Sequence, residues 1–229
     1  MSDGRFIVFE GIDGSGKGTQ VEILEERLQR EGYVVSCYEF PQYDKTIFGK
    51  FLRSLLDGEH GDVANFPAYL MSLPYAAGRW KASPLIRADL EAGKIVLADR
   101  YASSNMGHQG GKIQDNLELE EYISWLEQIE FSKKGFGIPR PDQINYLDLK
   151  PEISRKLMEK RAREKGIELD EVEKNFTYAK NSSRGFLRVA EMKGWNVINC
   201  NDYDKEDILP EQEIARQIWE FVEPILPAS

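Results

Sequence analysis

The chain has 229 residues, a length that suits one α/β domain with a sizeable core. Its 39 acidic residues outnumber the 30 basic ones, and the resulting net charge of −9 argues against a general nucleic-acid or anionic-membrane surface. Two cysteines, Cys37 and Cys200, are too few for a disulfide framework or a cysteine-ligated zinc site, so we expect buried free thiols.

In chain order, the first residues, MSDGRFIVFEG, lack a signal-peptide pattern. No apolar stretch of the sequence approaches the roughly 20 residues that a membrane span requires. We therefore expect a cytoplasmic protein with no membrane partner.

Short apolar runs alternate with longer segments of helical periodicity. We expect strands at residues 6–10, 34–39, 95–98, 143–149 and 195–199. Helices are predicted before Gly32, where Val21, Leu24 and Leu28 repeat at helical spacing, and at residues 47–56, 66–80, 84–92, 117–130, 152–165, 178–193 and 211–222. Strands separated by helices predict an α/β fold with a parallel five-stranded sheet flanked by helices and a ligand site beyond the carboxyl ends of the strands.

The stretch GIDGSGKGT follows the first predicted strand and opens a helix, which is the context of a phosphate-binding loop. Glycines permit close backbone approach, so consecutive N–H groups can surround a polyphosphate, and Lys17 adds an ammonium at the helix start. The alternative is a structural glycine turn. The predicted ATP phosphate site consists of Gly11, Gly14, Ser15, Gly16, Lys17, Gly18 and Thr19.

One position departs from the strict P-loop pattern, because Gly18 directly follows the lysine where Ser or Thr is usual. We expect Mg²⁺ to be held mainly by nucleotide phosphates, water and a carboxylate, with Thr19 as a further candidate ligand. Asp99 is the candidate carboxylate, since the third strand delivers Asp99 and Arg100 at its end. Arg100 can neutralise phosphate oxygens, although a structural salt bridge at the sheet edge is an alternative for this pair.

Tyr75 and Arg79 are four residues apart on a predicted helix and share a face. An aromatic plate beside a hydrogen-bonding fork suits a nucleobase. Core packing of Tyr75 and Trp80 is the alternative.

Residues 160–175 are charged throughout and have few core candidates. Such a segment is either a solvated helix pair or a mobile lid. Because phosphoryl transfer requires water to be excluded, we favour a lid at about residues 160–176 on a single P-loop kinase domain that spans residues 1–229.

Six motifs follow one another in a fixed order: EGIDGSGKGTQ, FPQY, GRW, DRYASSN, PRPD and the charged lid. Together they resemble the thymidylate kinase family of P-loop nucleoside monophosphate kinases, from residue 6 to about residue 197. The resemblance implies a kinase that transfers the ATP γ-phosphoryl group to dTMP, giving dTDP for dTTP synthesis. It also implies Mg²⁺ as cofactor, ATP and dTMP as ligands, no nucleic-acid partner, and a homodimer.

By this resemblance, Asp13 approaches the acceptor sugar and the phosphates, Tyr43 flanks the acceptor nucleotide, and Arg100 holds its phosphate. Lys17 and the P-loop amides serve ATP. The base contacts fall to Tyr75, which stacks on thymine, to Arg79 and Asn105 at the base edge, and to Gln109 in the pocket wall.

The family keeps a catalytic arginine either in the P-loop or in the lid. This P-loop carries no arginine, whereas the lid carries Arg161 and Arg163, so the chain resembles the lid-arginine kind. Spacing leaves open which of the two is catalytic.

Two departures from the family pattern affect the acceptor site. Gly107 and His108 stand where members usually have an Ala-Tyr pair near the sugar, which predicts weaker discrimination between deoxyribose and ribose. Gln42 stands where many members have an arginine. Another nucleoside monophosphate or deoxynucleoside kinase, or a catalytically silent nucleotide-binding protein, are the alternative functions.

Overall fold

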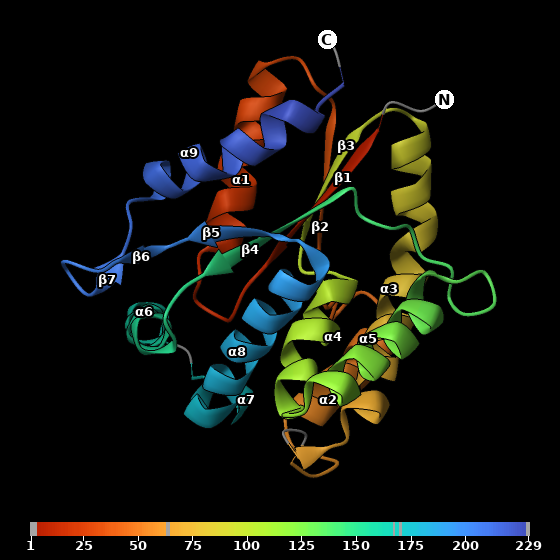
Figure 1. Ribbon diagram of the computed structural model, residues 1–229, viewed down its shortest axis with the longest axis vertical. Helices are drawn as coiled ribbons and strands as arrows, with labels where there is room; N and C mark the ends of the chain where they lie inside the picture. Colours follow the sequence, from red (N-terminus) through yellow and green to blue (C-terminus); the bar gives the residue numbers. More distant parts are fainter. Residues whose placement is uncertain (1–3, 63–64, 167, 170, 228–229) are drawn as a thin grey trace.

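The computed structural model describes residues 4–62, 65–166, 168–169 and 171–227. A central sheet of five parallel strands runs in the order β2-β3-β1-β4-β5 (Figure 1). The strands are β1 (Arg5–Glu10), β2 (Val35–Glu39), β3 (Ile95–Asp99), β4 (Gln143–Asp148) and β5 (Asn196–Asn199). This arrangement confirms the predicted α/β fold and its five parallel strands. β1 lies in the middle of the sheet, and its apolar residues from Phe6 to Phe9 are fully buried because both faces of the sheet are covered.

Nine α-helices surround the sheet within the described residues: α1 (Lys17–Arg30), α2 (Ile47–Leu56), α3 (Ala68–Glu91), α4 (Ala102–His108), α5 (Asn116–Phe131), α6 (Pro151–Lys165), α7 (Glu171–Lys174), α8 (Phe176–Lys193) and α9 (Glu211–Val222). Two 3₁₀ helices, Gly110–Lys112 and Glu223–Ile225, and a small hairpin of β6 (Asn201–Asp202) and β7 (Asp207–Ile208) complete the chain. None of the described helices is long and apolar enough to cross a membrane.

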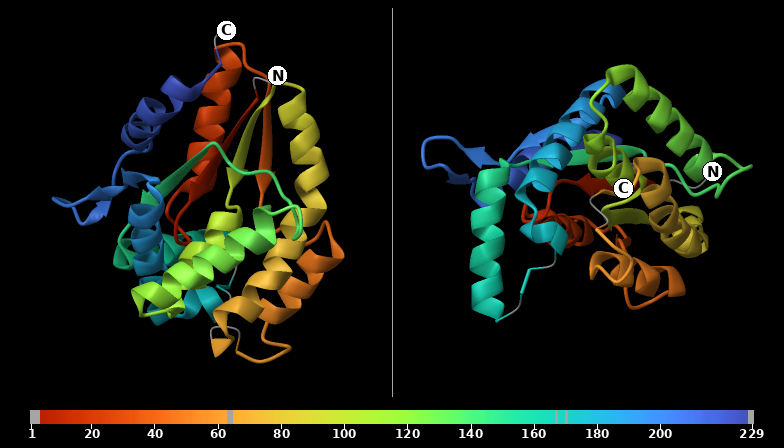
Figure 2. Two further views of the ribbon diagram at one scale, coloured as in Figure 1. Left: turned by 45° about the vertical axis from the view of Figure 1, so that its right-hand side comes forward. Right: turned by 90° about the horizontal axis from the view of Figure 1, so that it is seen from below.

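Alternating residues of β1 divide the core between the two faces of the sheet. Ile7 and Phe9 pack against α1 and α9, whereas Phe6 and Val8 pack against α3 and the start of α4. α5 adds an outer layer, since its apolar face meets Met106 of α4 and side chains of α8. Figure 2 shows these layers in two further views. β1 leads into the loop before α1 and β3 into α4, and α6 contacts that loop through a hydrogen bond from Ser154 to the Asp13 carbonyl.

The predicted helices at 66–80 and 84–92 are one helix, α3, so the predicted break between them is wrong. Pro84 has no N–H to bond the carbonyl of Trp80, but the hydroxyl of Ser83 donates to that carbonyl at 2.9 Å. Buried Ala82 and Ile86 hold the segment against the sheet on either side of the proline. Packing and one local side-chain bond thus outweigh the proline signal.

α4 was not predicted, because its sequence ASSNMGH contains mostly weak helix formers. Burial of Ala102 and Met106 stabilises it instead. The expectation of two buried thiols is half wrong: Cys200 is buried, but Cys37 is exposed because β2 is the edge strand of the sheet.

Candidate active site

The P-loop joins the end of β1 to the start of α1. Gly14 and Gly16 have left-handed backbone angles, with φ of 75° and 86°, which side chains rarely adopt. Gly16 is the N-cap of α1 and provides no side-chain cap, so the first amides of the helix remain available to an anion. Lys17 is 7% exposed, and its Nζ donates to the carbonyl oxygen of Ile12 at 3.0 Å. Burial, aided by the charge of Arg100, lowers the pKa of Lys17 to about 8.

Asp99 at the end of β3 faces the first turn of α1. A Cβ atom at Gly18 would lie 3.6 Å from its Oδ2. Its Oδ1 and the hydroxyl of Ser15 are buried and have no hydrogen-bond partner among the described residues. The described residues also include no group of three or more His, Cys, Asp or Glu side chains that could hold a metal. Asp99 offers one unused carboxylate oxygen, and Thr19 lies directly after Gly18 in α1. So small a set of protein ligands suits a Mg²⁺ ion held mainly by phosphates and water.

Arg100 is fixed in the P-loop by three partners. Its Nη2 pairs with Asp13 Oδ1 at 2.5 Å, and its Nη1 donates to the Gly11 carbonyl at 2.8 Å and to His108 Nε2 at 2.9 Å. A guanidinium only donates, so Nε2 accepts and the imidazole carries its proton on Nδ1, which donates to Ser182 Oγ at 3.0 Å. The salt bridge therefore joins Arg100 to Asp13 in the P-loop.

These contacts set the protonation of the cluster. Burial and the charge of Arg100 lower the pKa of His108 to about 3, so the ring is neutral at pH 7. Burial opposes ionisation of Asp13, but Arg100 and Lys17 outweigh it and hold the pKa of this carboxyl below its usual range. Lys17, Arg100 and the ionised Asp13 thus lie together beyond the end of β1.

Three tyrosines line the side of the cluster that faces α2 and α8. Tyr43 and Tyr75 are partly buried against an apolar cluster of α2 and α3, and the guanidinium of Arg53 lies 4.2 Å from the centre of the Tyr43 ring. Burial raises the pKa of Tyr43, and the neighbouring Tyr75 raises it further. Tyr178 of α8 stacks on His108, with ring centres 5.8 Å apart. The charge of Asp13 raises the pKa of both Tyr43 and Tyr178.

The core-packing alternative for Tyr75 and Trp80 is wrong for Trp80 alone, because Tyr75 packs against the apolar cluster of α2 and α3. Trp80 is 46% exposed, and its ring contacts Phe136 at the surface rather than the core. Tyr75 retains partial exposure beside Tyr43.

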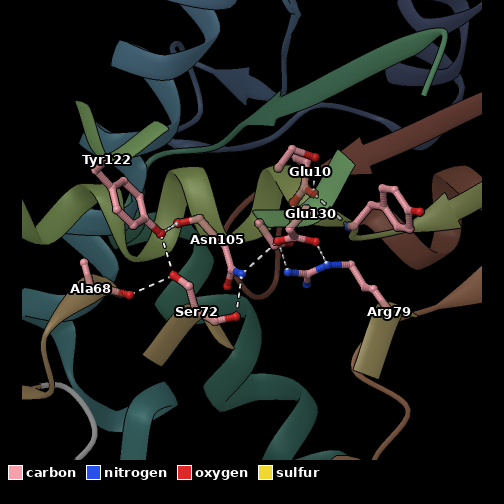
Figure 3. A network of polar contacts seen from close by, with 10 residues as sticks. Glu10, Ala68, Ser72, Arg79, Asn105, Tyr122 and Glu130 are labelled. Atoms are coloured by element: carbon pink, nitrogen blue, oxygen red, sulfur yellow. Dashed lines mark hydrogen bonds and ion pairs between the residues drawn. The ribbon is translucent and has the colours of Figure 1, made fainter. Parts of the chain in front are cut away.

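A buried polar network joins α3, α4 and α5 (Figure 3). Arg79 is 2% exposed and forms a bidentate ion pair with Glu130 of α5, with Nε–Oε2 at 2.7 Å and Nη2–Oε1 at 2.5 Å. The side-chain amide of Asn105 donates to Glu130 Oε1 at 3.2 Å and to the Ser72 carbonyl at 3.1 Å. The hydroxyl of Tyr122 lies between Ser72 Oγ and the Asn105 carbonyl. Arg79 and Asn105, predicted separately, are therefore joined through one carboxylate.

Gln109 is buried directly after α4, and among the described residues its Oε1 has no hydrogen-bond partner. It lies in the same segment as Asn105 and His108.

The lid arginines lie apart from this cluster. Arg161 and Arg163 are exposed in the last turns of α6, and neither forms a hydrogen bond or ion pair with any described residue. The start of the same helix does touch the P-loop, because the hydroxyl of Ser154 donates to the Asp13 carbonyl. α6 is thus anchored to the P-loop near its first residues and carries the two arginines near its last residues.

Sequence reasoning missed several residues of the site. Glu10 is fully buried: its Oε1 accepts from the Tyr101 amide at 2.9 Å and from Ser103 Oγ at 2.6 Å, and its Oε2 accepts from Ser104 Oγ at 2.6 Å. Burial raises its pKa. The sequence did contain one indication, because Glu10 is the only carboxylate of β1 and directly follows its apolar residues.

Glu130 had no such signal, because α5 is rich in glutamates and only the fold shows which of them turns inward. Tyr178, Ser154 and Ser182 were also missed, since their roles depend on contacts with distant segments.

A glycine loop at the end of the central parallel strand, with a basic cluster tied to that loop, defines a P-loop kinase. Residues 9–209 match the sequence profile of the thymidylate kinase family. The chain is 34% identical over 226 residues to a thymidylate kinase of Synechococcus sp. (strain JA-2-3B'a(2-13)), covering 98% of this chain and 97% of that one. It is 33% identical over 227 residues to a probable thymidylate kinase of Thermococcus kodakarensis, covering 96% and 98%.

A human thymidylate kinase is 34% identical over 146 residues, covering 64% of this chain and 61% of that one. The chain belongs to the thymidylate kinase family. The predicted family, and with it an ATP-dependent phosphotransferase that acts on a nucleoside monophosphate, is confirmed.

Proposed function

We propose that this protein transfers the γ-phosphoryl group of ATP to the phosphate of dTMP, giving dTDP and ADP, with the P-loop as donor site and the Arg100 side as acceptor site. The observation that carries the proposal is the attachment of Arg100 to the P-loop itself, through Gly11 and Asp13. A cation for the acceptor phosphate is thereby fixed beside the loop that holds the donor phosphates. Two anionic groups that repel each other in water would meet there in a defined geometry.

Charge neutralisation and alignment account for catalysis, because phosphoryl transfer needs no protein nucleophile. The α1 amides and Lys17 hold the donor phosphates, while Arg100 holds the acceptor phosphate. Asp13 keeps Arg100 in place and flanks the acceptor sugar with Tyr43. Tyr75 stacks on the base, Arg79 and Asn105 bond its edge, and Gln109 closes the wall. The neutral His108 ring lies near the sugar and adds no charge that would compete for phosphate.

Asp99 and Thr19 are the residues that would orient Mg²⁺. When bound, this ion supplies positive charge to the phosphate oxygens. Asp99 suits this role because its Oδ1 is buried without a partner among the described residues.

Residues 160–176 act as a lid in this proposal, on a single kinase domain of residues 1–229. Closure would carry Arg161 or Arg163 toward the transferred group and exclude water. Exposed apolar side chains along α3, including Leu70, Leu73 and Leu85, support a homodimer. Two free thiols suit a cytoplasmic location.

Release of ADP measured across acceptors tests the proposal. We expect the highest kcat/KM for dTMP when dTMP, dUMP, dCMP, AMP, CMP and thymidine are compared at saturating ATP. A chain that phosphorylates AMP, CMP or thymidine as well as dTMP would be another nucleotide or nucleoside kinase. Binding of ATP without acceptor-dependent turnover would indicate a silent nucleotide-binding protein.

A further inference from the structure

Glu130 accepts every hydrogen bond that joins Arg79 to Asn105. Its Oε1 receives both Arg79 Nη2 at 2.5 Å and Asn105 Nδ2 at 3.2 Å, so the two groups lie side by side on one oxygen. Its Oε2 receives Arg79 Nε at 2.7 Å. Figure 3 shows the carboxylate between the two side chains. With 0% exposure for Glu130 and 2% for Arg79, water does not compete for these bonds.

These bonds decide which atoms remain for a ligand. Two of the three guanidinium nitrogens of Arg79 are occupied by Glu130, and the amide nitrogen of Asn105 is occupied by Glu130 and Ser72. In the part of the chain that the structure describes, Arg79 Nη1 and Asn105 Oδ1 take part in no hydrogen bond. Neither atom is sealed from solvent. Unused donor hydrogens of Arg79 and the acceptor oxygen of Asn105 therefore remain, on two side chains that meet at Glu130 Oε1.

This pairing matches one kind of pyrimidine edge. Thymine offers an oxygen acceptor at position 4 beside an N–H donor at position 3, whereas cytosine offers an amino donor beside a nitrogen acceptor. A pocket with a fixed donor and a fixed acceptor can bond the first edge twice and is opposed at both positions by the second.

Charge supports the same conclusion. Glu130 neutralises the charge of Arg79, so the base end of the pocket offers directed hydrogen bonds without a net positive charge. Arg100 keeps a cationic role at the phosphate end, because its carboxylate partner Asp13 is shared with Lys17. The nucleotide would therefore enter with its base toward the neutral pair and its phosphate toward Arg100.

We propose that Glu130 is a positioning residue that sets the hydrogen-bonding polarity of the base pocket and thereby selects thymine over cytosine. The proposal rests on the proposed function, and it adds the residue that fixes Arg79 and Asn105. Glu130 itself does not touch the nucleotide.

Glu130→Gln is the direct test, because an amide has one acceptor oxygen where the carboxylate has two. Its NH₂ group opposes a donor of Arg79 or Asn105, so at least one of these two side chains loses its fixed position. We expect kcat/KM for dTMP to fall about tenfold to a hundredfold, mainly through KM, while kcat/KM for dCMP stays level or rises. KM for ATP should not change.

Glu127→Gln is the matched control. It removes a carboxylate one turn earlier on the same helix, where Glu127 is 25% exposed and pairs with Lys193 at 2.9 Å. The ratio of kcat/KM for dTMP to that for dCMP should match the wild type. If it falls as it does in Glu130→Gln, the effect belongs to the helix and the proposal is wrong.

Glu130→Asp keeps the charge if Glu130→Gln fails to fold. The shorter side chain cannot reach Arg79 and Asn105 together, so the dTMP to dCMP ratio should fall by about threefold or more with an unchanged KM for ATP. An unchanged ratio in every variant that folds, or equal losses for both acceptors, overturns the role of Glu130. A wild-type enzyme that prefers another acceptor to dTMP contradicts the proposed function instead.

Discussion

The proposed donor and acceptor regions of this protein are built by different means. The donor region is one continuous stretch, Gly11 to Thr19, in which the conformation of the backbone creates the anion site and the Lys17 contact spans five residues. The acceptor region is made of side chains whose partners are distant in sequence: Arg79 and Glu130 are 51 residues apart, and Arg100 and Asp13 are 87 apart. A site made of backbone depends on local conformation, whereas a site made of side chains depends on the packing of the elements that carry them.

Lys17→Ala gives the largest expected effect and tests the donor region alone. Loss of a cation that stabilises the transferred phosphoryl group should lower kcat by about 10²- to 10³-fold for every acceptor. Steady-state ADP release measures this, and circular dichroism checks that the fold is retained. The exposed Lys134→Ala is the control. Turnover within a few-fold of wild type would remove Lys17 from the catalytic machinery.

Gly185→Ala tests whether the acceptor region depends on helix packing. A Cβ atom at Gly185 would lie 2.2 Å from the carbonyl oxygen of Gly107 and 2.7 Å from the Cα of Gly111, so α8 touches α4 and the following 3₁₀ helix through backbone. We expect the free energy of unfolding to fall by about 1–3 kcal/mol, because backbone atoms cannot turn aside as a side chain can. Urea denaturation measures the loss.

Gly78→Ala, measured by the same urea denaturation, should change stability in the opposite direction. Gly78 lies inside α3, and nothing lies within 4 Å of an added Cβ atom. Alanine there should raise the free energy of unfolding by about 0.5–1 kcal/mol. If both variants change stability alike, the contact at Gly185 is not the cause.

His108 gives an expected effect that appears only with pH. Its pKa is about 3 in the folded protein and about 6.5 when unfolded, so between these values the unfolded chain binds more protons. The contribution of the neutral His108 to the free energy of unfolding is therefore complete above pH 6.5. It decreases as the pH falls, by up to about 1.4 kcal/mol per pH unit.

His108→Gln should remove this part of the acid sensitivity. Urea unfolding at pH 7.5, 6 and 5 should show that the stability difference between wild type and variant shrinks as the pH falls. The exposed His60→Gln serves as control. A difference that is constant with pH would mean that His108 is not held neutral.

The comparison of the two regions also explains how much could be read from the sequence. The P-loop and all five strands were predicted, because contiguous glycines and apolar runs specify them locally. Arg79, Arg100 and Asp13 were predicted as site residues, but neither the Arg100–Asp13 ion pair nor Glu130, the partner of Arg79, was predicted. In the sequence, nothing beside Glu130 distinguishes it from the other glutamates of α5. α4 was missed because burial rather than helix propensity stabilises it. The continuity of α3 through Pro84 required a hydroxyl that a sequence pattern does not reveal.

Arg100 has a φ of 68°, a left-handed conformation that costs a non-glycine residue about 1–3 kcal/mol. Its amide donates to the Phe9 carbonyl at 2.9 Å, and the next amide donates to Glu10. The bent backbone is therefore held from both sides by the end of β1. Anyone grafting Arg100 onto another scaffold would have to transfer Glu10 and strand β1 with it, because the arginine alone would relax into an ordinary conformation and aim its guanidinium elsewhere.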